Sequence, residues 1–181
     1  VASGRSVHYD VGRFNEHFFS YVAAFGAFSW LSYTTDQNAK NLLGHTAYIL
    51  DGIKDLPKVK PYHVRLTADG EVHEGDYLFG AVGNTLSIAG TLTLPEAEVD
   101  TCDGVFELLL VREPKTLPEL QEIVRGLLTQ DYSSPLLEFC HAREITAECP
   151  PDMEWTVDGE FGGRGGEVHI EPLPGFLELR G

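Results

Sequence analysis

Trp155-Thr156-Val157-Asp158-Gly159-Glu160-Phe161-Gly162-Gly163 is the stretch that decides the fold of this chain. A strand-like run ends at Asp158-Gly159, and an apolar residue follows Glu160. Asp-Gly between two such runs is a strong β-hairpin signal, because both residues tolerate a positive φ. The stretch therefore predicts a tight antiparallel turn within a sheet of short, connected strands.

The same turn carries two acids, Asp158 and Glu160, on either side of a glycine. Glycine lets another group come close to the backbone. Two carboxylates placed in this way can share work: one accepts a proton, and the other orients it or helps to hold a cation. The hairpin and the catalytic pair are compatible interpretations, because catalytic groups often lie on tight turns.

Outward from this turn, most of the chain favours short antiparallel strands. The sequence Ala68-Asp69-Gly70-Glu71 predicts another turn, and a break at Gly26 is expected inside an aromatic, buried strand. The expected strands cover residues 17–33, 63–67, 71–79, 80–82, 91–94, 105–111, 143–147, 154–157, 167–171 and 176–179.

Two helices interrupt the strands. Apolar residues recur at helical spacing between Asn38 and Ile53, and again between Pro118 and Gln130, where Thr116 is a plausible N-cap. Many short strands with two separate helices predict a mainly β (α+β) fold, an antiparallel β-sandwich with helical additions. With 181 residues and no clear linker, the chain is expected to form one domain over residues 1–181.

Composition excludes several classes of function. The formal net charge is −15, so the chain should repel nucleic acid, and electrostatic adsorption to anionic lipid is disfavoured. Cys102, Cys140 and Cys149 are odd in number and show no metal-binding spacing, which favours a reducing cytoplasm. No apolar run approaches the length of a membrane span. Because Val1 is not a start methionine, the chain is expected to be part of a longer protein.

A series of motifs in fixed order resembles the C-terminal domain of bacterial diacylglycerol kinase-like lipid kinases, which are related to sphingosine kinases. Each motif is weak by itself, but the order is specific and covers nearly the whole chain. The motifs are Tyr9-Asp10-Val11-Gly12-Arg13-Phe14-Asn15, the aromatic run over residues 18–28, Lys40-Asn41-Leu42-Leu43-Gly44-His45, residues 47–53, Asp100-Thr101-Cys102-Asp103-Gly104-Val105-Phe106-Glu107-Leu108, residues 158–163 and Leu173-Pro174-Gly175-Phe176.

The resemblance implies a two-domain architecture shared with NAD kinases. An N-terminal domain with a Gly-Gly-Asp-Gly-Thr type loop would hold the nucleotide phosphates, and the C-terminal β-sandwich would carry part of the lipid site. No Gly-Gly-Asp-Gly-Thr run occurs in this chain. The nucleotide-binding domain is therefore expected to be absent from it, and the chain by itself is expected to be inactive.

By the same resemblance, Glu160 and Asp158 are the catalytic residues. One of them would accept the proton of the acceptor hydroxyl as that oxygen attacks the γ-phosphate of ATP. The resemblance does not say which acid is the base.

The resemblance also implies a structural Mg²⁺ next to Asp103-Gly104. Relatives place a side-chain ligand where this chain has Cys102, which is a poor ligand for a hard cation. The substitute set would be Asp103 or Asp100 with backbone carbonyls of Val105 and Glu107. The alternative is that Asp103-Gly104 is only a turn.

Two functions from different classes follow. The first is the C-terminal domain of an ATP-dependent lipid kinase that phosphorylates a diacylglycerol-like or sphingoid alcohol. Its partners would be the lipid at the membrane surface and its own N-terminal domain, with homodimerisation left open; its location would be cytoplasmic and peripheral to the membrane. The second is a non-catalytic β-sandwich module for lipid binding or dimerisation.

Overall fold

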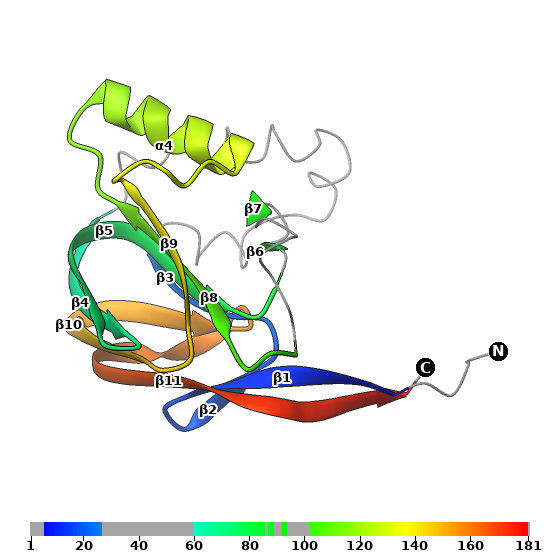
Figure 1. Ribbon diagram of the computed structural model, residues 1–181. Coiled ribbons are helices and arrows are strands. Elements are labelled where there is room, and N and C mark those ends of the chain that lie inside the picture. Colours follow the sequence, from blue (N-terminus) through cyan, green and yellow to red (C-terminus); the bar gives the residue numbers. More distant parts are fainter. Residues whose placement is uncertain (1–5, 27–59, 86, 89–91, 94–101, 181) are drawn as a thin grey trace, which may run out of the picture.

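The computed structural model describes residues 6–26, 60–85, 87–88, 92–93 and 102–180 (Figure 1). The helix expected over residues 38–53 lies outside these ranges. The elements are β1 (Ser6–Phe14), β2 (His17–Phe19), β3 (Val22–Gly26), β4 (Tyr62–Ala68), β5 (Glu71–Gly83), β6 (Ser87–Ile88), β7 (Leu92–Thr93), β8 (Phe106–Arg112), α4 (Leu117–Thr129), β9 (Leu137–Ala142), β10 (Ile145–Val157) and β11 (Glu160–Arg180).

Nine of the described strands form one antiparallel sheet in the order β2-β1-β11-β10-β3-β5-β8-β9, and β4 pairs with both β10 and β5. Strand β10 pairs with β4 through Ile145–Glu148 and with β3 through Trp155–Val157. Strand β5 likewise pairs with both β4 and β3. Strands β3 and β4 both pair with β5 and with β10, at different points along those two long strands, so the sheet curls over its own core. The two layers of the expected sandwich are thus parts of one continuous sheet within the described residues.

Two hydrophobic clusters fill the two sides of this sheet. The inner cluster centres on Trp155, whose ring centroid lies 4.9 Å from that of Phe25 and 5.1 Å from that of Phe14. The outer cluster includes Ile123 and Leu127 of α4 with residues of β3, β5, β8 and β9. Burying aromatic and aliphatic surface on both faces stabilises the sheet and holds α4 against it (Figure 1).

Helix α4 confirms the helix expected over residues 118–130. Thr116 is its N-cap, and its hydroxyl accepts a hydrogen bond from the Glu119 N–H at 3.3 Å. The Glu119 carboxylate in turn accepts one from the Thr116 N–H at 3.2 Å, which completes a capping box. The mainly β fold class is confirmed, and α4 is the helix that the described part of the chain contains.

The strand boundaries differ from the sequence prediction in instructive ways. The single strand expected from residue 17 is interrupted at Ser20-Tyr21, which separates β2 from β3. The pieces expected over 143–147 and 154–157 are one strand, β10, and those over 167–171 and 176–179 belong to β11. Register shifts inside both strands absorb the intervening residues. The pieces expected over 71–79 and 80–82 are likewise one strand, β5, and strands β1, β6 and β9 were not predicted.

Strands β1 and β11 form an arm that extends from the body of the sheet (Figure 1). They pair from Phe14↔Ile170 near the core to Ser6↔Arg180 at the outer end, and β2 adds a short third strand. We call β1, β2 and the part of β11 paired with β1 the arm.

Candidate active site

The turn between β10 and β11 is a two-residue hairpin loop, as the sequence predicted. Val157 pairs with Glu160, and the loop residues Asp158 and Gly159 have φ values of 49° and 85°. Two positive φ values are typical of the type I′ turn, whose twist matches that of the strands.

The Asp158 carboxylate accepts hydrogen bonds from the turn between β2 and β3. Its Oδ1 accepts hydrogen bonds from the N–H groups of Tyr21 and Val22, both at 2.9 Å. Its Oδ2 accepts from the Ser20 N–H at 2.8 Å and the Ser20 hydroxyl at 3.2 Å. The Asp158 N–H donates to the Val22 carbonyl at 2.8 Å. We call this arrangement the Asp158 clamp; it commits both carboxylate oxygens to the turn between β2 and β3.

The Glu160 carboxylate is placed differently. Glu160 is exposed at the start of β11, directly after the clamp. Within the described residues, its carboxylate makes no hydrogen bond or ion pair. The two acids that the sequence placed together therefore have different surroundings: the Asp158 carboxylate is held in the clamp, and the Glu160 carboxylate is exposed and unbonded within the described residues.

Behind the clamp lies a second layer of polar contacts. The Tyr21 carbonyl accepts a hydrogen bond from the Asn84 N–H at 3.3 Å, and the Asn84 side-chain amide donates to the Asp10 carbonyl at 3.3 Å. Asn84 is 6% exposed and follows the end of β5, where Gly83 pairs with Val22. This layer fixes the end of β5 against the turn that Asp158 holds.

Asp10 is a buried acid in this layer, 1% exposed. Its Oδ2 accepts a hydrogen bond from the Gly104 N–H, and its Oδ1 accepts one from the Gly175 N–H, both at 2.6 Å. The contact with Gly175 lies at the register shift between β1 and β11. Asp10 therefore joins the start of β8 to the arm, and charge-assisted bonds of this kind are the stronger ones.

Glu107 is a second buried acid, 2% exposed, on β8 opposite Gly83. Burial raises the pKa of Glu107 to about 7, although the backbone N–H groups of Glu107 and Thr85 and the neighbouring His141 oppose the rise. Its Oε2 is buried without a hydrogen-bond partner among the described residues. Such a group is costly when charged, so its proton is retained to higher pH than usual.

The residues expected to hold Mg²⁺ do not complete a site in the described part of the chain. The Asp103 Oδ1 accepts a hydrogen bond from the Val105 N–H at 3.0 Å, as in a local turn. Glu107 lies inside the β8 ladder, and the Cys102 thiol donates to the His8 carbonyl. No group of three or more His, Cys, Asp or Glu residues suited to a metal is found among the described residues. Asp100, the other carboxylate expected as a ligand, lies outside the described residues, so the metal assignment stays a prediction.

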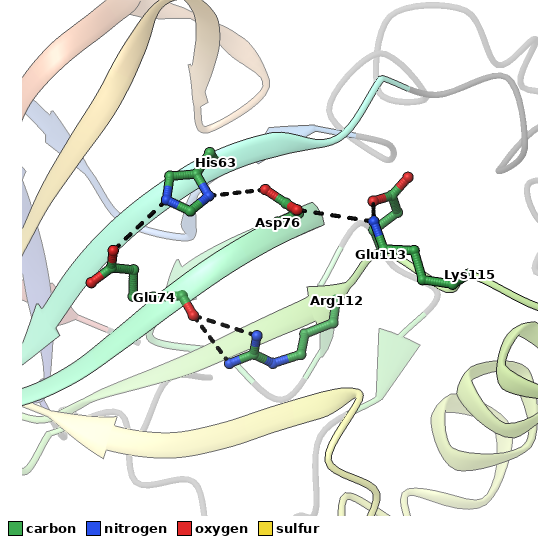
Figure 2. Close-up of polar contacts among 6 residues, drawn as sticks. All are labelled: His63, Glu74, Asp76, Arg112, Glu113 and Lys115. Atoms are coloured by element: carbon green, nitrogen blue, oxygen red, sulfur yellow. Dashed lines mark hydrogen bonds and ion pairs between the residues drawn. The ribbon is translucent and has the colours of Figure 1, made fainter.

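Other polar clusters in the described residues are structural. Figure 2 shows one on β4, β5 and β8, where His63 contacts Asp76 at 2.9 Å and Lys115 contacts Asp76 at 3.9 Å. These groups are exposed, and surface ion pairs contribute little. A less exposed cluster centres on Glu138, which accepts from Tyr77 at 3.0 Å and pairs with Arg112 at 2.5 Å. It ties β5, β8 and β9 together.

The sequence analysis missed the layer behind the clamp. Asp10 carried a signal, because a lone acid in an otherwise β-like run is either exposed or buried with partners. Its partners, Gly104 and Gly175, lie 94 and 165 residues away along the chain. No local pattern reveals contacts at that separation.

The curled antiparallel sheet, with polar hairpin turns at one end and a helix over its outer face, defines a class: the β-rich C-terminal domains of the diacylglycerol and NAD kinase fold. A profile for the family described as "YegS C-terminal NAD kinase beta sandwich-like domain" matches residues 26–180. The chain belongs to this family, the C-terminal domain of the diacylglycerol kinase-like lipid kinases.

Individual relatives agree. A Staphylococcus saprophyticus protein named diacylglycerol kinase is 33% identical over 183 residues, which cover 99% of this chain and 56% of the relative. A Staphylococcus aureus (strain Newman) protein of the same name is 33% identical over 166 residues, covering 91% and 52%. The chain thus spans about half the length of these relatives.

Solved structures share the fold. A crystal structure of a Bacillus anthracis protein described as a putative diacylglycerol kinase gives a TM-score of 0.70 at 23% identity, covering 96% of this chain and 57% of that one. An Archaeoglobus fulgidus NAD kinase solved in complex with ATP gives 0.53 at 12% identity, covering 93% and 52%. The described residues contain no helix long and apolar enough to cross a membrane.

Proposed function

We propose that this chain is the C-terminal domain of an ATP-dependent lipid kinase in which Glu160 is the general base and Asp158 positions it. The lipid acceptor would be a diacylglycerol-like or sphingoid alcohol. Family membership and the names of the relatives support a kinase. The observation that carries the assignment of roles is the clamp: four donors bond the Asp158 carboxylate, whereas the Glu160 carboxylate makes no bond among the described residues.

The proposed chemistry requires one proton acceptor beside the acceptor alcohol. As the lipid hydroxyl oxygen forms a bond to the γ-phosphorus of ATP, its O–H bond breaks and the proton passes to a Glu160 carboxylate oxygen. The bond from that phosphorus to the bridging oxygen breaks, and ADP leaves. Glu160 then returns the proton to solvent. A general base has to lie within hydrogen-bond reach of the hydroxyl whose proton it accepts.

The clamp would supply the positioning that this step needs. Asp158 fixes the loop directly before Glu160, and its hydrogen bonds to Ser20, Tyr21 and Val22 anchor that loop to the sheet. A base held within about 3 Å of its proton contributes to the rate, and small displacements lower it.

The remaining components would come from outside the described residues. A nucleotide-binding N-terminal domain would hold ATP, because the chain has no phosphate-binding glycine loop of the expected kind. The lipid would be met at the membrane surface, which implies a cytoplasmic, peripheral protein. A Mg²⁺ at Asp103 stays a separate expectation, and no step above depends on it.

The test is transfer of radiolabelled phosphate from ATP to diacylglycerol in mixed micelles, using the complete polypeptide that carries this chain. Glu160→Gln should lower kcat by about two to four orders of magnitude, because general-base catalysis contributes that much. The matched control is Glu71→Gln: Glu71 is also an exposed glutamate directly after an Asp-Gly hairpin loop.

Two results would remove the proposal. One is an unchanged kcat in Glu160→Gln. The other is phosphate transfer by residues 1–181 alone, since the proposed chemistry needs a separate nucleotide-binding domain. A non-catalytic lipid-binding or dimerisation module remains the alternative if the complete polypeptide transfers no phosphate to any alcohol lipid.

A further inference from the structure

The cluster around Glu138, which ties β5, β8 and β9 together, also contains a cysteine. The Cys140 Sγ lies 3.9 Å from the His73 Nε2, within hydrogen-bond reach for sulfur. The other ring nitrogen, His73 Nδ1, lies 2.7 Å from the Glu138 Oε2. A thiol, an imidazole and a carboxylate thus follow one another in hydrogen-bonding order, which is the arrangement in which a histidine activates a sulfur nucleophile.

The three residues come together from two strands. Glu138 and Cys140 are two positions apart on β9, so their side chains lie on the same face, and His73 reaches them from β5. No ladder joins β9 to β5 among the described strands. Side chains bridge the two strands instead, and His73 is 9% exposed between them.

Glu138 is itself held in a position that orients His73. Its Oε1 accepts a hydrogen bond from the Tyr77 hydroxyl at 3.0 Å and pairs with the Arg112 Nε at 2.5 Å. An ionised carboxylate can only accept hydrogen bonds. In the neutral imidazole, the proton therefore lies on Nδ1, and Nε2 presents its lone pair to the Cys140 thiol.

Cys140 needs a base of this kind in order to react. Burial raises the pKa of Cys140 to about 11, with further contributions from the carboxylates of Glu71, Glu138 and Asp69. At pH 7 only about one Cys140 in ten thousand is then a thiolate. The thiolate is the nucleophile, so a neighbouring base that takes the proton during attack removes this barrier.

Cys149 is a matched comparison within the same chain. It is half-buried like Cys140, and burial raises its pKa to about 11 as well. Its polar neighbour is the Trp155 indole, which can donate a hydrogen bond but cannot take a proton. The two thiols therefore differ in whether a base adjoins them.

We propose that Cys140 is a modification site for neutral α,β-unsaturated carbonyl compounds, with His73 as the base, an inference that goes beyond the proposed kinase function and does not depend on it. The sulfur forms a bond to the β-carbon while the S–H bond breaks and its proton passes to the His73 Nε2. The C=C π electrons move to the carbonyl oxygen. The proton then passes from His73 to the α-carbon as the carbonyl forms again, so no oxidant and no leaving group are needed.

The surroundings of Cys140 select this class of electrophile. The charged groups that raise its pKa are all carboxylates, and they disfavour anionic reagents such as glutathione disulfide or acyl-coenzyme A. Cys140 also packs against the inner hydrophobic cluster, which favours a reagent with an apolar part. A neutral carbonyl compound with a polarised C=C bond meets both conditions.

Site-resolved labelling of the complete polypeptide with N-ethylmaleimide tests the inference. Mass spectrometry of the digested protein gives separate rates for Cys140 and Cys149. At pH 7 Cys140 should react at least about tenfold faster, because general-base assistance contributes about a hundredfold or more. Equal rates, or a faster reaction at Cys149, would overturn the inference.

His73→Gln supplies the second measurement, because glutamine stays polar but cannot take the proton. It should lower the Cys140 rate at least about tenfold and leave the Cys149 rate unchanged. A purely structural His73 would give the opposite sign, since its loss would loosen the contact between β5 and β9 and speed labelling of Cys140. An unchanged or higher rate in a folded variant therefore contradicts the role of base; if the variant unfolds, both cysteines react fast and the ratio in the parent decides.

The charge of the reagent tests its class. 3-Maleimidopropionic acid has the same reactive ring as N-ethylmaleimide and adds a carboxylate. Its rate at Cys140 relative to N-ethylmaleimide should be about threefold lower in the folded than in the urea-unfolded protein, the effect of one like charge about 6 Å away in water. A ratio that unfolding leaves unchanged would remove the preference for neutral reagents.

Discussion

Two hairpin loops in this domain have the same sequence and different surroundings. Asp69-Gly70-Glu71 joins β4 to β5, and Asp158-Gly159-Glu160 joins β10 to β11. The φ values are 46° and 90° in the first loop and 49° and 85° in the second. Both are therefore the same type of turn, formed by the same tripeptide.

Each aspartate also clamps a neighbouring turn. Asp69 Oδ1 accepts hydrogen bonds from the N–H groups of Arg143 at 3.1 Å and Glu144 at 2.8 Å, and its own N–H donates to the Glu144 carbonyl at 2.9 Å. Asp158 does the same with the turn before β3. Strand β10 runs between the two clamps, from Ile145 beside the first to Val157 beside the second.

The difference lies behind the clamps. Asp69 holds the tight turn from β9 to β10, whereas Asp158 holds a turn that continues through Asn84 to the buried Asp10. Asp-Gly-Glu therefore specifies a clamped hairpin in both places, and the proposed catalytic role of Glu160 would depend on the residues behind its clamp. The two loops provide matched pairs of variants.

The largest expected difference is catalytic. Glu160→Gln should lower kcat of the complete kinase at least a hundredfold, and Glu71→Gln should leave it within about twofold, because only one of the two exposed glutamates would face the substrates. Both amides keep the size of the side chain, so thermal unfolding should be unchanged in either variant. Equal activity of the two variants would mean that the two loops do not differ in function.

The second difference separates stability from turnover. Asp158→Asn and Asp69→Asn each weaken several hydrogen bonds from backbone N–H groups to a carboxylate, which contribute about 1.5–3 kcal/mol when charged. Each variant should lose about 3 kcal/mol in urea unfolding. Asp158→Asn should also lower kcat by a larger factor than it changes KM, because the Asp158 clamp adjoins Glu160. Asp69→Asn should not have this effect. A loss of turnover in both, in proportion to stability, would contradict a positioning role.

The features of the two loops that depend on neighbouring residues could be predicted from the sequence. Both Asp-Gly turns and the Thr116 cap of α4 follow from neighbouring residues, and the structure contains all three. The use of the Asp158 side chain could not be predicted, because its partners at Ser20 to Val22 lie 136 to 138 residues away. For the same reason, the sequence offered Asp158 and Glu160 as equal candidates for the base.

The missed and merged strands have a similar cause. Strand β11 contains Pro172, Pro174 and several glycines, which normally end a strand, but register shifts accommodate them against β1 and β10. Strand β1 carries the buried Asp10 at an inward position, which breaks the expected alternation. Both departures depend on pairing between residues far apart in the sequence, which a local sequence pattern does not predict.

A third prediction concerns the layer behind the Asp158 clamp, where Glu107 lies. Its pKa is raised to about 7 in the folded chain against 4.5 ordinarily, so the folded state binds the extra proton between these values. The contribution of Glu107 to stability is greatest below pH 4.5 and falls as the pH rises through 7, by about 3 kcal/mol in all.

Glu107→Gln tests this because it removes the titration and keeps the shape. Other carboxylates also titrate, so the quantity to compare is the difference in unfolding free energy between variant and parent at pH 5 and pH 8, with EDTA present. The variant should gain stability relative to the parent as the pH rises. A difference that is independent of pH would show that Glu107 is ionised normally in the folded state.

The smallest effect should be equal in the two loops. Gly70 has open space where a Cβ would lie, so Gly70→Ala costs only the strain of a positive φ, about 1 kcal/mol. Gly159→Ala should cost about the same, because its φ of 85° differs little from 90°. Urea unfolding of both variants measures this. A markedly larger loss at Gly159 would mean that the backbone there is held against a close neighbour, as a loop that shapes a substrate site would be, and the two hairpins would then differ in their backbone as well as in their surroundings.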